Sequence, residues 1–268
     1  MCKRISCSAD IYVNDAFGTV HRNHASTSII TKFFPNKKYF GELLSREICS
    51  LERALNNAER PITGIIGGAK ITGKIDVIKS LFNKVDNLII GGGMAYTFAK
   101  AKGGRVGKSL VENEKVDLAK ELIYEAKKRG VNLVLPTDSV NADRFNNNAN
   151  TNTSNILSIE KCYMGLDIGS ESIANFSKII KASKTIIWNG PMGVFEIEKF
   201  ETGTKKIGEA ICLATEKGAF SLVGGGDSIA AVQKFNFENR LSYISTGGGA
   251  MLKYLEGGLL PGIVAILN

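Results

Sequence analysis

The sequence predicts an α/β protein built on a doubly wound parallel sheet. From Pro61 onward, six short apolar runs each end in glycine or another turn former: ITGIIGG, NLIIGGG, VNLVLP, TIIWNG, FSLVGGG and YISTGGG. Their apolar residues follow one another without alternation, as is typical of strands that helices cover on both faces. Amphipathic stretches separate the runs. A chain that alternates strands with helices in this way favours parallel pairing.

Two of the separating stretches have a clear helical period. Residues 115–130, KVDLAKELIYEAKKRG, end in basic residues and a glycine, which are common signals at a helix C-terminus. Residues 205–218, KKIGEAICLATEKG, also place their apolar side chains on one face. We expect a helix in each stretch. The apolar face of the first contains Val116, Ala119, Ile123 and Ala126.

Segments outside this repeating plan set the expected domain boundaries. A helix predicted within residues 39–59 separates an opening segment, residues 1–38, from the main domain of residues 60–250. Residues 251–268 follow as a C-terminal tail. The polar, low-complexity run NNNANTNTSN, residues 146–155, predicts a surface loop. The apolar face of the separating helix contains Leu44, Ile48, Leu51 and Leu55.

Composition and charge restrict the possible partners. The formal charge of +8 favours anionic partners. The lysines are spread along helical stretches, and no basic run is interleaved with aromatic residues, so phosphorylated small molecules are favoured over nucleic acid. No apolar run approaches the roughly 18 residues that a membrane helix requires. The sequence therefore predicts no membrane partner.

The cysteines and the first residues indicate a cytoplasmic protein. Five cysteines form no CxxC pair, and only two histidines are available to help build a metal site. Scattered, reduced thiols are typical of a cytosolic protein. The opening MCKRISCSAD lacks the apolar core of a secretory signal.

Glycines gather where the predicted strands end. Ligands of parallel α/β sheets bind beyond the carboxyl ends of the strands, and backbone N–H groups in a glycine-rich turn before a helix can bind phosphate. One cluster alone could merely relieve crowding at a strand–helix turn. Several clusters along one edge favour a polyphosphate ligand. They lie at residues 67–68, 91–93, 224–226 and 247–249 and at Gly190.

The stretch GAKITGKI, residues 68–75, matches only part of a P-loop. It contains GxxxxGK, but Ile75 stands where a P-loop has the hydroxyl that binds magnesium. A P-loop NTPase is therefore disfavoured. Lys70 and Lys74 are four residues apart and would share one face of a helix beginning after Gly68, directed at one phosphate chain. Two solvated lysines are an equally good interpretation of the spacing.

Asp227 is a candidate magnesium ligand. In GGGDSIAAV it stands at a predicted helix start directly after three glycines. An N-cap is the more common role for such an aspartate. Beside a phosphate site it could instead hold Mg²⁺, which favours one or two carboxylates together with substrate oxygens. The segment WNGPMGVFE adds Asn189 and Glu196 beyond another strand. No GxGxxG follows a predicted strand, so a dinucleotide-binding dehydrogenase lacks its usual fingerprint.

Together these segments resemble the signatures of the phosphoglycerate kinase family. Seven occur in the family's order: DAFGTVHRNHAS, GGAKITGK, GGGMAYTF, MGLDIG, WNGPMGVFE, GGGDS and STGGGA. The resemblance implies a Rossmann-like nucleotide-binding domain in residues 60–250, an interdomain helix in 39–59 and, in 1–38, a remnant of an N-terminal α/β domain that binds 3-phosphoglycerate. Counterparts of the family's DFNVP, SHLGRP and ENLRF segments are missing, so we expect an N-terminally truncated member.

The resemblance also implies roles for individual residues. Lys70 would stabilise the transferring phosphoryl group, and Gly248 and Gly249 would present a helix N-terminus to it. Arg22 would help to bind 3-phosphoglycerate, and Asp227 would hold Mg²⁺. The residues implied to bind the nucleotide are Lys74 and Asn189 at the phosphates, Gly165 at the adenine, Glu196 at the ribose, and the loop of Gly225, Gly226, Asp227 and Ser228.

The implied reaction is reversible phosphoryl transfer between 1,3-bisphosphoglycerate with MgADP and 3-phosphoglycerate with MgATP, in glycolysis and gluconeogenesis. The expected cofactors are thus ATP or ADP and Mg²⁺, and the expected partners are these small molecules. The family is usually monomeric. The alternative is a truncated nucleotide-binding module with little or no kinase activity on its own.

Overall fold

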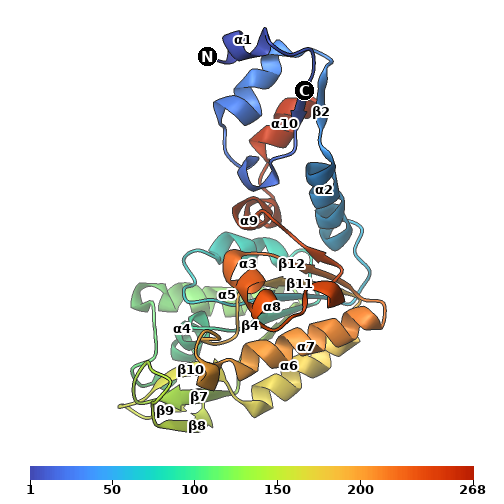
Figure 1. The fold of residues 1–268 in the computed structure, drawn as a ribbon. Coiled ribbons are helices and arrows are strands. Elements are labelled where there is room, and N and C mark those ends of the chain that lie inside the picture. The colour runs from blue at the N-terminus through green and yellow to red at the C-terminus, as the bar shows by residue number, and fades with distance from the viewer.

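A computed structural model describes all 268 residues of the chain. The larger of its two regions is an α/β unit, and the smaller region contains both ends of the chain (Figure 1). Helix α2 (Glu42–Leu55) runs between them, where the sequence predicts a helix within residues 39–59. No helix of the structure has the length and apolar character needed to cross a membrane.

The larger region is built on a six-stranded parallel sheet with the strand order β13–β12–β11–β3–β4–β6. From β3 the chain adds strands toward one edge, and from β11 it adds strands toward the other edge. The doubly wound sheet is therefore confirmed, with its switch point between β3 and β11. The strands are β3 (Ile62–Ile66), β4 (Asn87–Ile90), β6 (Asn132–Val134), β11 (Thr185–Asn189), β12 (Phe220–Val223) and β13 (Tyr243–Ile244), each within one of the six predicted runs.

Successive strand residues point to opposite sides of the sheet, so continuous apolar strands make both of its faces apolar. Helices cover both faces. In β11, Ile187 packs in one apolar cluster, whereas Ile186 and Trp188 pack in the other. The first cluster joins α2, α3 (Ile75–Leu81), α4 (Met94–Ala101), α5 (Val116–Lys128) and α9 (Gly248–Leu255). The second joins α6 (Ser170–Ala182), α7 (Thr202–Glu216) and α8 (Gly226–Lys234). Both predicted amphipathic helices, α5 and α7, are present.

A small antiparallel sheet extends the larger region beyond the predicted βα plan. Its order is β10 (Met164–Ile168), β7 (Asp138–Ala142) and β8 (Thr151–Asn155). A two-residue pair, β5 (Arg105–Val106) and β9 (Ser158–Ile159), lies nearby. Short helical turns complete the region: η4 (Asn113–Lys115), η5 (Glu198–Phe200) and η6 (Glu238–Arg240).

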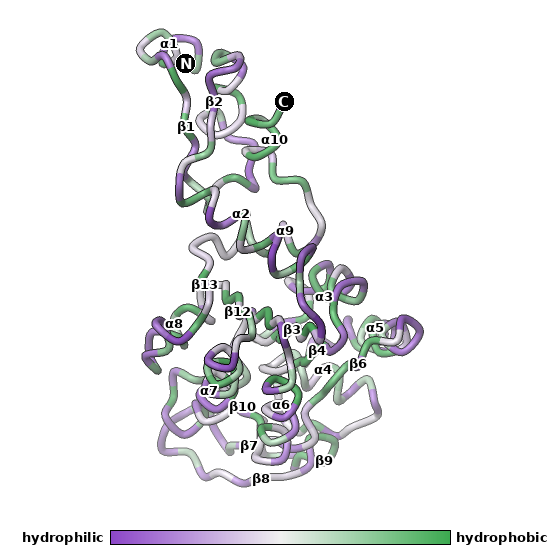
Figure 2. The backbone as a smooth tube through the Cα atoms, turned by 90° about the vertical axis from the view of Figure 1, so that its right-hand side faces the viewer, coloured by the Kyte–Doolittle hydropathy of each residue, from purple (hydrophilic) through white to green (hydrophobic).

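Strand β8 corrects the prediction of a loop for residues 146–155, since residues 151–155 pair with β7. Polar residues can form this strand because it is an edge strand. Its Asn152 and Ser154 accept hydrogen bonds at 2.9 and 3.0 Å from the side-chain amide of Asn141 in β7. Figure 2 shows β8 and the loop leading to it in hydrophilic colours at the margin of the molecule.

The smaller region combines the first 40 residues with the end of the chain (Figure 1). Helix α10 packs against the opening segment, where Lys38 donates to the carbonyl of Ala265 at 2.9 Å and the Gly262 amide donates to the carbonyl of Val20 at 2.9 Å. The elements are α1 (Cys2–Ser6), β1 (Tyr12–Asn14), η1 (Phe17–Thr19), η2 (Ala25–Ile29), η3 (Ile30–Phe33), β2 (Lys38–Phe40) and α10 (Pro261–Leu267).

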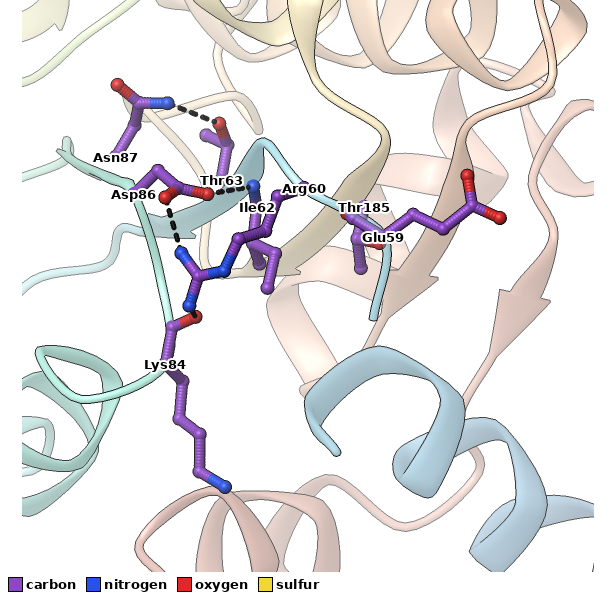
Figure 3. A network of polar contacts seen from close by, with 8 residues as sticks. All are labelled: Glu59, Arg60, Ile62, Thr63, Lys84, Asp86, Asn87 and Thr185. Atoms are coloured by element: carbon purple, nitrogen blue, oxygen red, sulfur yellow. Dashed lines mark hydrogen bonds and ion pairs between the residues drawn. The ribbon is translucent and has the colours of Figure 1, made fainter. Parts of the chain in front are cut away.

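Polar contacts join the amino ends of the three central strands (Figure 3). Asp86, just before β4, forms an ion pair with Arg60 and accepts the Ile62 amide of β3 at 2.7 Å. At the start of β11, the Thr185 hydroxyl donates to the carbonyl of Glu59 at 2.8 Å. Backbone and side-chain groups at this end of the sheet therefore satisfy one another.

Candidate functional site

Two hollows lie at the opposite, carboxyl end of the central strands. The larger measures about 680 Å³ and the smaller about 230 Å³. Asp227 lines both hollows. Directly after β11, Gly190 lines the smaller hollow and Pro191 lines the larger one. This is the switch point of the sheet, where ligands of doubly wound folds bind.

The larger hollow has mostly apolar walls. Gly165 lies in its lining, and a Cβ added there would be 2.2 Å from the Tyr96 hydroxyl, so only glycine leaves this wall flat. The Tyr96 hydroxyl is itself hydrogen-bonded to Ser139 at 2.8 Å, and the Gly165 amide donates to the Ser109 hydroxyl at 2.9 Å. Glu196 is exposed in the same lining. A flat apolar slot with an acid beside it suits an aromatic base and an adjoining hydroxylated sugar.

The smaller hollow gathers most of the residues that the sequence nominated for phosphate binding. Lys74 donates a hydrogen bond to the side-chain carbonyl of Asn189 across it, and the Asn189 amide group donates to the carbonyl of Gly224 at 2.7 Å. Helices α8 and α9 both begin at this hollow. Its nominated lining residues are Lys74, Asn189, Gly225, Gly226, Asp227, Ser228, Gly248 and Gly249.

The electrostatics of the smaller hollow favour an anion. Burial lowers the pKa of the Lys74 ammonium, and the nearby carboxylate of Asp227 partly opposes that shift. A cation held in a partly desolvated site gains from an added negative charge. The N-termini of α8 and α9 contribute further positive potential and free N–H groups. Together these groups could bind a chain of phosphates.

Two residues of the 225–228 loop have a structural task. Gly225 has φ +99°, and a Cβ there would lie 2.6 Å from the Asn189 side-chain nitrogen, so the turn requires glycine. The Ser228 hydroxyl is fully buried and accepts the Gly190 amide at 2.6 Å. This bond ties the start of α8 to the end of β11. A contact between Ser228 and phosphate stays a prediction.

The prediction of a helix that begins directly after Gly68 is wrong. Helix α3 begins only at Ile75, and residues 68–74 form a loop. The loop persists because the buried carboxylate of Glu112 accepts the amides of Ile71 and Thr72 as well as the Thr72 hydroxyl. Lys74 consequently reaches the smaller hollow, whereas Lys70 is exposed and lines neither hollow.

Asp227 occupies the first turn of α8 and makes no capping hydrogen bond, and the N-cap position belongs to Gly225. Its side chain is exposed between the two hollows. No group of three or more His, Cys, Asp or Glu side chains could form a metal cage. A lone carboxylate beside a phosphate site fits Mg²⁺, which takes one or two carboxylates and completes its shell with water and phosphate oxygens.

The opening segment also reaches this edge of the sheet. Phe17 packs so closely on Gly247 that a Cβ there would lie 2.4 Å from its ring, and His21 lies against Gly249. Burial, followed by the charges of Arg22 and His24, lowers the pKa of His21. Arg22 is exposed, lines neither hollow, and donates to the His21 ring at 3.2 Å. Arg22 is therefore linked to the start of α9 through His21, which contacts Gly249.

Glu47 connects helix α2 to the same edge. Its fully buried carboxylate accepts the Thr246 amide at 2.6 Å and the Thr246 hydroxyl at 2.8 Å, while its second oxygen has no partner. Burial and the charge of Glu47 raise the pKa of Tyr243 to about 12. The turn that leads into α9 is thus held by the helix between the two regions.

Sequence reasoning missed several residues of the larger hollow. Tyr96, Lys108 and Leu110 line it, as does Phe145, whose side chain remains 61% exposed. Phe145 comes from the polar stretch before β8, which carries no periodic signal. Only the long-range pairing of β7 with β10 brings that stretch near Gly165.

Comparisons with known proteins give one answer. The family model described as phosphoglycerate kinase matches residues 1–258. A phosphoglycerate kinase of Porphyromonas gingivalis is 53% identical over 265 residues, which cover 98% of this chain and 63% of that protein. One from Nostoc sp. is 51% identical over 264 residues, or 98% of this chain and 66% of the relative.

Solved structures agree with the sequence relatives. Phosphoglycerate kinase from Coxiella burnetii superimposes with a TM-score of 0.95 at 42% identity, covering 99% of this chain and 67% of that one. The enzyme from Pyrococcus horikoshii gives a TM-score of 0.85 at 31% identity, covering 99% and 65%. The chain spans about two thirds of the length of the relatives it matches.

Proposed function

The chain belongs to the phosphoglycerate kinase family, and from this premise we propose that it catalyses reversible phosphoryl transfer between 1,3-bisphosphoglycerate with MgADP and 3-phosphoglycerate with MgATP. The observation that carries the proposal is the pair of hollows that meet at Asp227. One is apolar and flat at Gly165. The other is lined by glycines, a lysine and two helix N-termini. That combination supports a nucleotide lying across the switch point.

The nucleotide would lie with its base against Gly165 and its ribose hydroxyls toward Glu196. Its phosphates would extend into the smaller hollow, toward Lys74, Asn189 and the loop of Gly225, Gly226, Asp227 and Ser228. The shared position of Asp227 in both linings supports this direction. A nucleotide in this pose ends with its terminal phosphate near the start of α9.

Mg²⁺ would be held by Asp227 and the nucleotide phosphates. Bound there, it would neutralise charge on the phosphate oxygens. The exposed, uncapped carboxylate of Asp227 supports this assignment. Asp227 is the one acid that lines the smaller hollow, so the assignment predicts that metal and nucleotide bind together.

The remaining residues would position the reactants and stabilise charge in the transition state. Phosphoryl transfer needs little covalent chemistry from the protein, because catalysis depends on alignment and on neutralising the charge of the transferring group. The N-terminus of α9 at Gly248 and Gly249 would receive that group, and Lys70 would approach it from its exposed loop. Arg22 would bind the acid substrate, a role supported by its hydrogen bond to His21, which lies against Gly249.

We also place this activity in the cytoplasm. Five cysteines without a disulfide support a reducing compartment. Some curated relatives are chloroplast proteins, such as one from Arabidopsis thaliana. A monomeric state and the use of small molecules rather than nucleic acid belong to the same proposal.

Calorimetry with ADP, in the presence and absence of Mg²⁺, tests the proposal. The wild-type chain should bind MgADP, and Asp227→Asn should weaken MgADP binding about tenfold, the effect of losing one charged contact, while metal-free ADP binds as before. Asp76→Asn is the matched control, because Asp76 is an exposed acid in the first turn of α3 that lines neither hollow. Equal losses with and without Mg²⁺ would contradict the magnesium role.

A coupled assay for ATP formation from 1,3-bisphosphoglycerate then separates the two functions considered for this chain. Turnover that Arg22→Met abolishes supports the kinase. Binding of MgADP without turnover supports a nucleotide-binding module.

A further inference from the structure

The segment between β11 and α7 contributes a continuous part of the lining of the larger hollow, here called the Glu196 wall, but contains no strand or helix before η5. Its lining residues are Pro191, Gly193, Val194, Glu196 and Ile197. An irregular segment that must present a flat apolar wall and a carboxylate needs bonds from elsewhere to hold its shape. Two buried residues, neither of which lines the hollow, contribute to this support. One accepts amides of the wall directly, and the other bonds the helix that carries the first.

Thr204 is the first of them. It lies in the first turn of α7, is fully buried, and accepts the amides of Met192 at 3.0 Å and Gly193 at 3.3 Å through its hydroxyl oxygen. The next amide, that of Val194, donates to the carbonyl of Leu166 in β10 at 2.9 Å. Three successive N–H groups of the wall therefore bind groups outside it.

Asp167 is the second. Its carboxylate accepts the Gly203 amide at the start of α7 at 2.7 Å and the Ile168 amide at 2.9 Å. Burial raises its pKa to about 7, and no cation pairs with it. A Cβ added to Gly193 or to Gly203 would lie 2.2 Å from a carboxylate oxygen, so the wall and the helix both press on this side chain.

These contacts connect three elements in turn. Asp167 of β10 bonds the start of α7, Thr204 of α7 bonds the wall, and Val194 of the wall bonds β10. We propose that Thr204, supported by Asp167, is a positioning residue that sets the distance between the Glu196 wall and the Gly165 wall, and thereby the affinity for the nucleoside part of the nucleotide. The inference rests on the proposed function. It extends that function by assigning Thr204 to recognition of the nucleoside alone, since the phosphates would lie in the smaller hollow.

The test compares Thr204→Val, which keeps the shape but removes the acceptor, with Thr204→Ser, which keeps the hydroxyl. Thr204→Val should weaken MgADP binding about tenfold, because the buried amide of Met192 and the partly buried amide of Gly193 lose their acceptor. Thr204→Ser should retain the wild-type affinity. Magnesium pyrophosphate, which has no nucleoside, should bind wild type and Thr204→Val equally, whereas a general loss of structure would weaken both ligands together.

Asp167→Asn provides a second variant of equal volume, whose amide group must face one of two N–H donors. It should likewise weaken MgADP binding selectively. Unchanged MgADP affinity in folded Thr204→Val, or in Asp167→Asn if Thr204→Val does not fold, would overturn the inference and leave the proposed function standing. Failure of the wild-type chain to bind MgADP would overturn both.

Discussion

The two ends of the central strands use polar groups in opposite ways. At the amino ends of β3, β4 and β11, Asp86 pairs with Arg60 and accepts the Ile62 amide (Figure 3). The hydroxyl of Thr63 bonds to Ser183 at 2.6 Å. At the carboxyl end of the sheet, β3, β4 and β11 lead into glycine turns, and Lys74 in the loop after β3 presents a partly desolvated ammonium. The N-termini of α8 and α9, which follow β12 and β13, lie at the same end.

The difference separates stability from binding along a single sheet. Polar groups that satisfy one another at the amino ends have little left to offer a ligand, but they hold strands in register. Groups at the carboxyl ends are only partly satisfied by the protein, so a ligand can complete them. Changes at one end should therefore alter affinity, and changes at the other end should alter the free energy of unfolding.

Gly226→Val should have the largest effect. Gly226 lines the smaller hollow, and a Cβ there meets no atom within 4 Å, so the new side chain would fill space meant for phosphate without straining the fold. We expect MgADP binding to weaken more than about 100-fold, or ~2.7 kcal/mol, with little change in thermal stability. Ala230→Val, on an exposed position of the same helix, is the control. Equal affinities of the two variants in calorimetry would argue against phosphate at this hollow.

Lys74 sharpens the comparison through pH. Because burial lowers the pKa of Lys74, a bound polyphosphate should raise that pKa again. ADP binding should then take up a proton at alkaline pH, and affinity should fall as pH rises through the lowered pKa. Lys74→Met should weaken binding about tenfold at neutral pH.

Calorimetry in buffers of different ionisation enthalpy measures this proton uptake. Lys74→Arg should bind without it, since arginine stays charged throughout this range. Proton uptake of the same size in Lys74→Arg would assign the titration to another group.

Asp86→Ala examines the amino end. It leaves the nearly buried Ile62 amide without an acceptor, so we expect a loss of about 1–3 kcal/mol in the free energy of unfolding, toward the low end because Arg60 is more than half exposed. MgADP affinity should not change. Asp117→Ala, which removes an exposed ion pair with Lys120, should cost almost nothing. Urea unfolding monitors both, and a loss of ADP affinity in Asp86→Ala would break the separation between the two ends.

Thr63→Val should have the smallest effect. Thr63 is fully buried, and its hydroxyl bonds to Ser183 and accepts from Asn87 at 3.3 Å. Ser183 keeps a second bond, to the carbonyl of Ile179. We expect a loss of about 1 kcal/mol in urea unfolding and recovery in Thr63→Ser, which retains the hydroxyl. A variant as stable as wild type would show that this hydroxyl contributes nothing to strand register.

The sequence predicts the sheet well because its signals are local. Each strand is a continuous apolar run closed by a turn former, and each glycine cluster marks the carboxyl end of a strand. From those clusters, the charged and amide residues near them and the family resemblance, residues as distant as Lys74, Asn189, Asp227 and Gly248 are predicted at one edge, and they do line one hollow. The parallel topology brings these residues together, since it places the carboxyl ends of all the strands at one edge of the sheet.

Features that depend on contacts between distant segments could not be predicted in this way. The spacing of Lys70 and Lys74 resembles a helical turn, but Glu112 holds the intervening amides in a loop. Strand β8, TNTSN, has no apolar residue and lies in a low-complexity polar run, and it forms because β7 offers an edge. Thr204 has no local signal for its role, which depends on amides 11 and 12 residues earlier in the chain.

Backbone hydrogen exchange with and without MgADP tests the separation of the two ends most directly. MgADP should slow exchange in residues 67–74, 189–197 and 224–228 and at the start of α9. Amides around Ile62 and Asp86 at the amino ends should exchange at the same rate in both states. Protection centred on the amino ends, or no protection at the glycine turns while MgADP is bound, would contradict this separation.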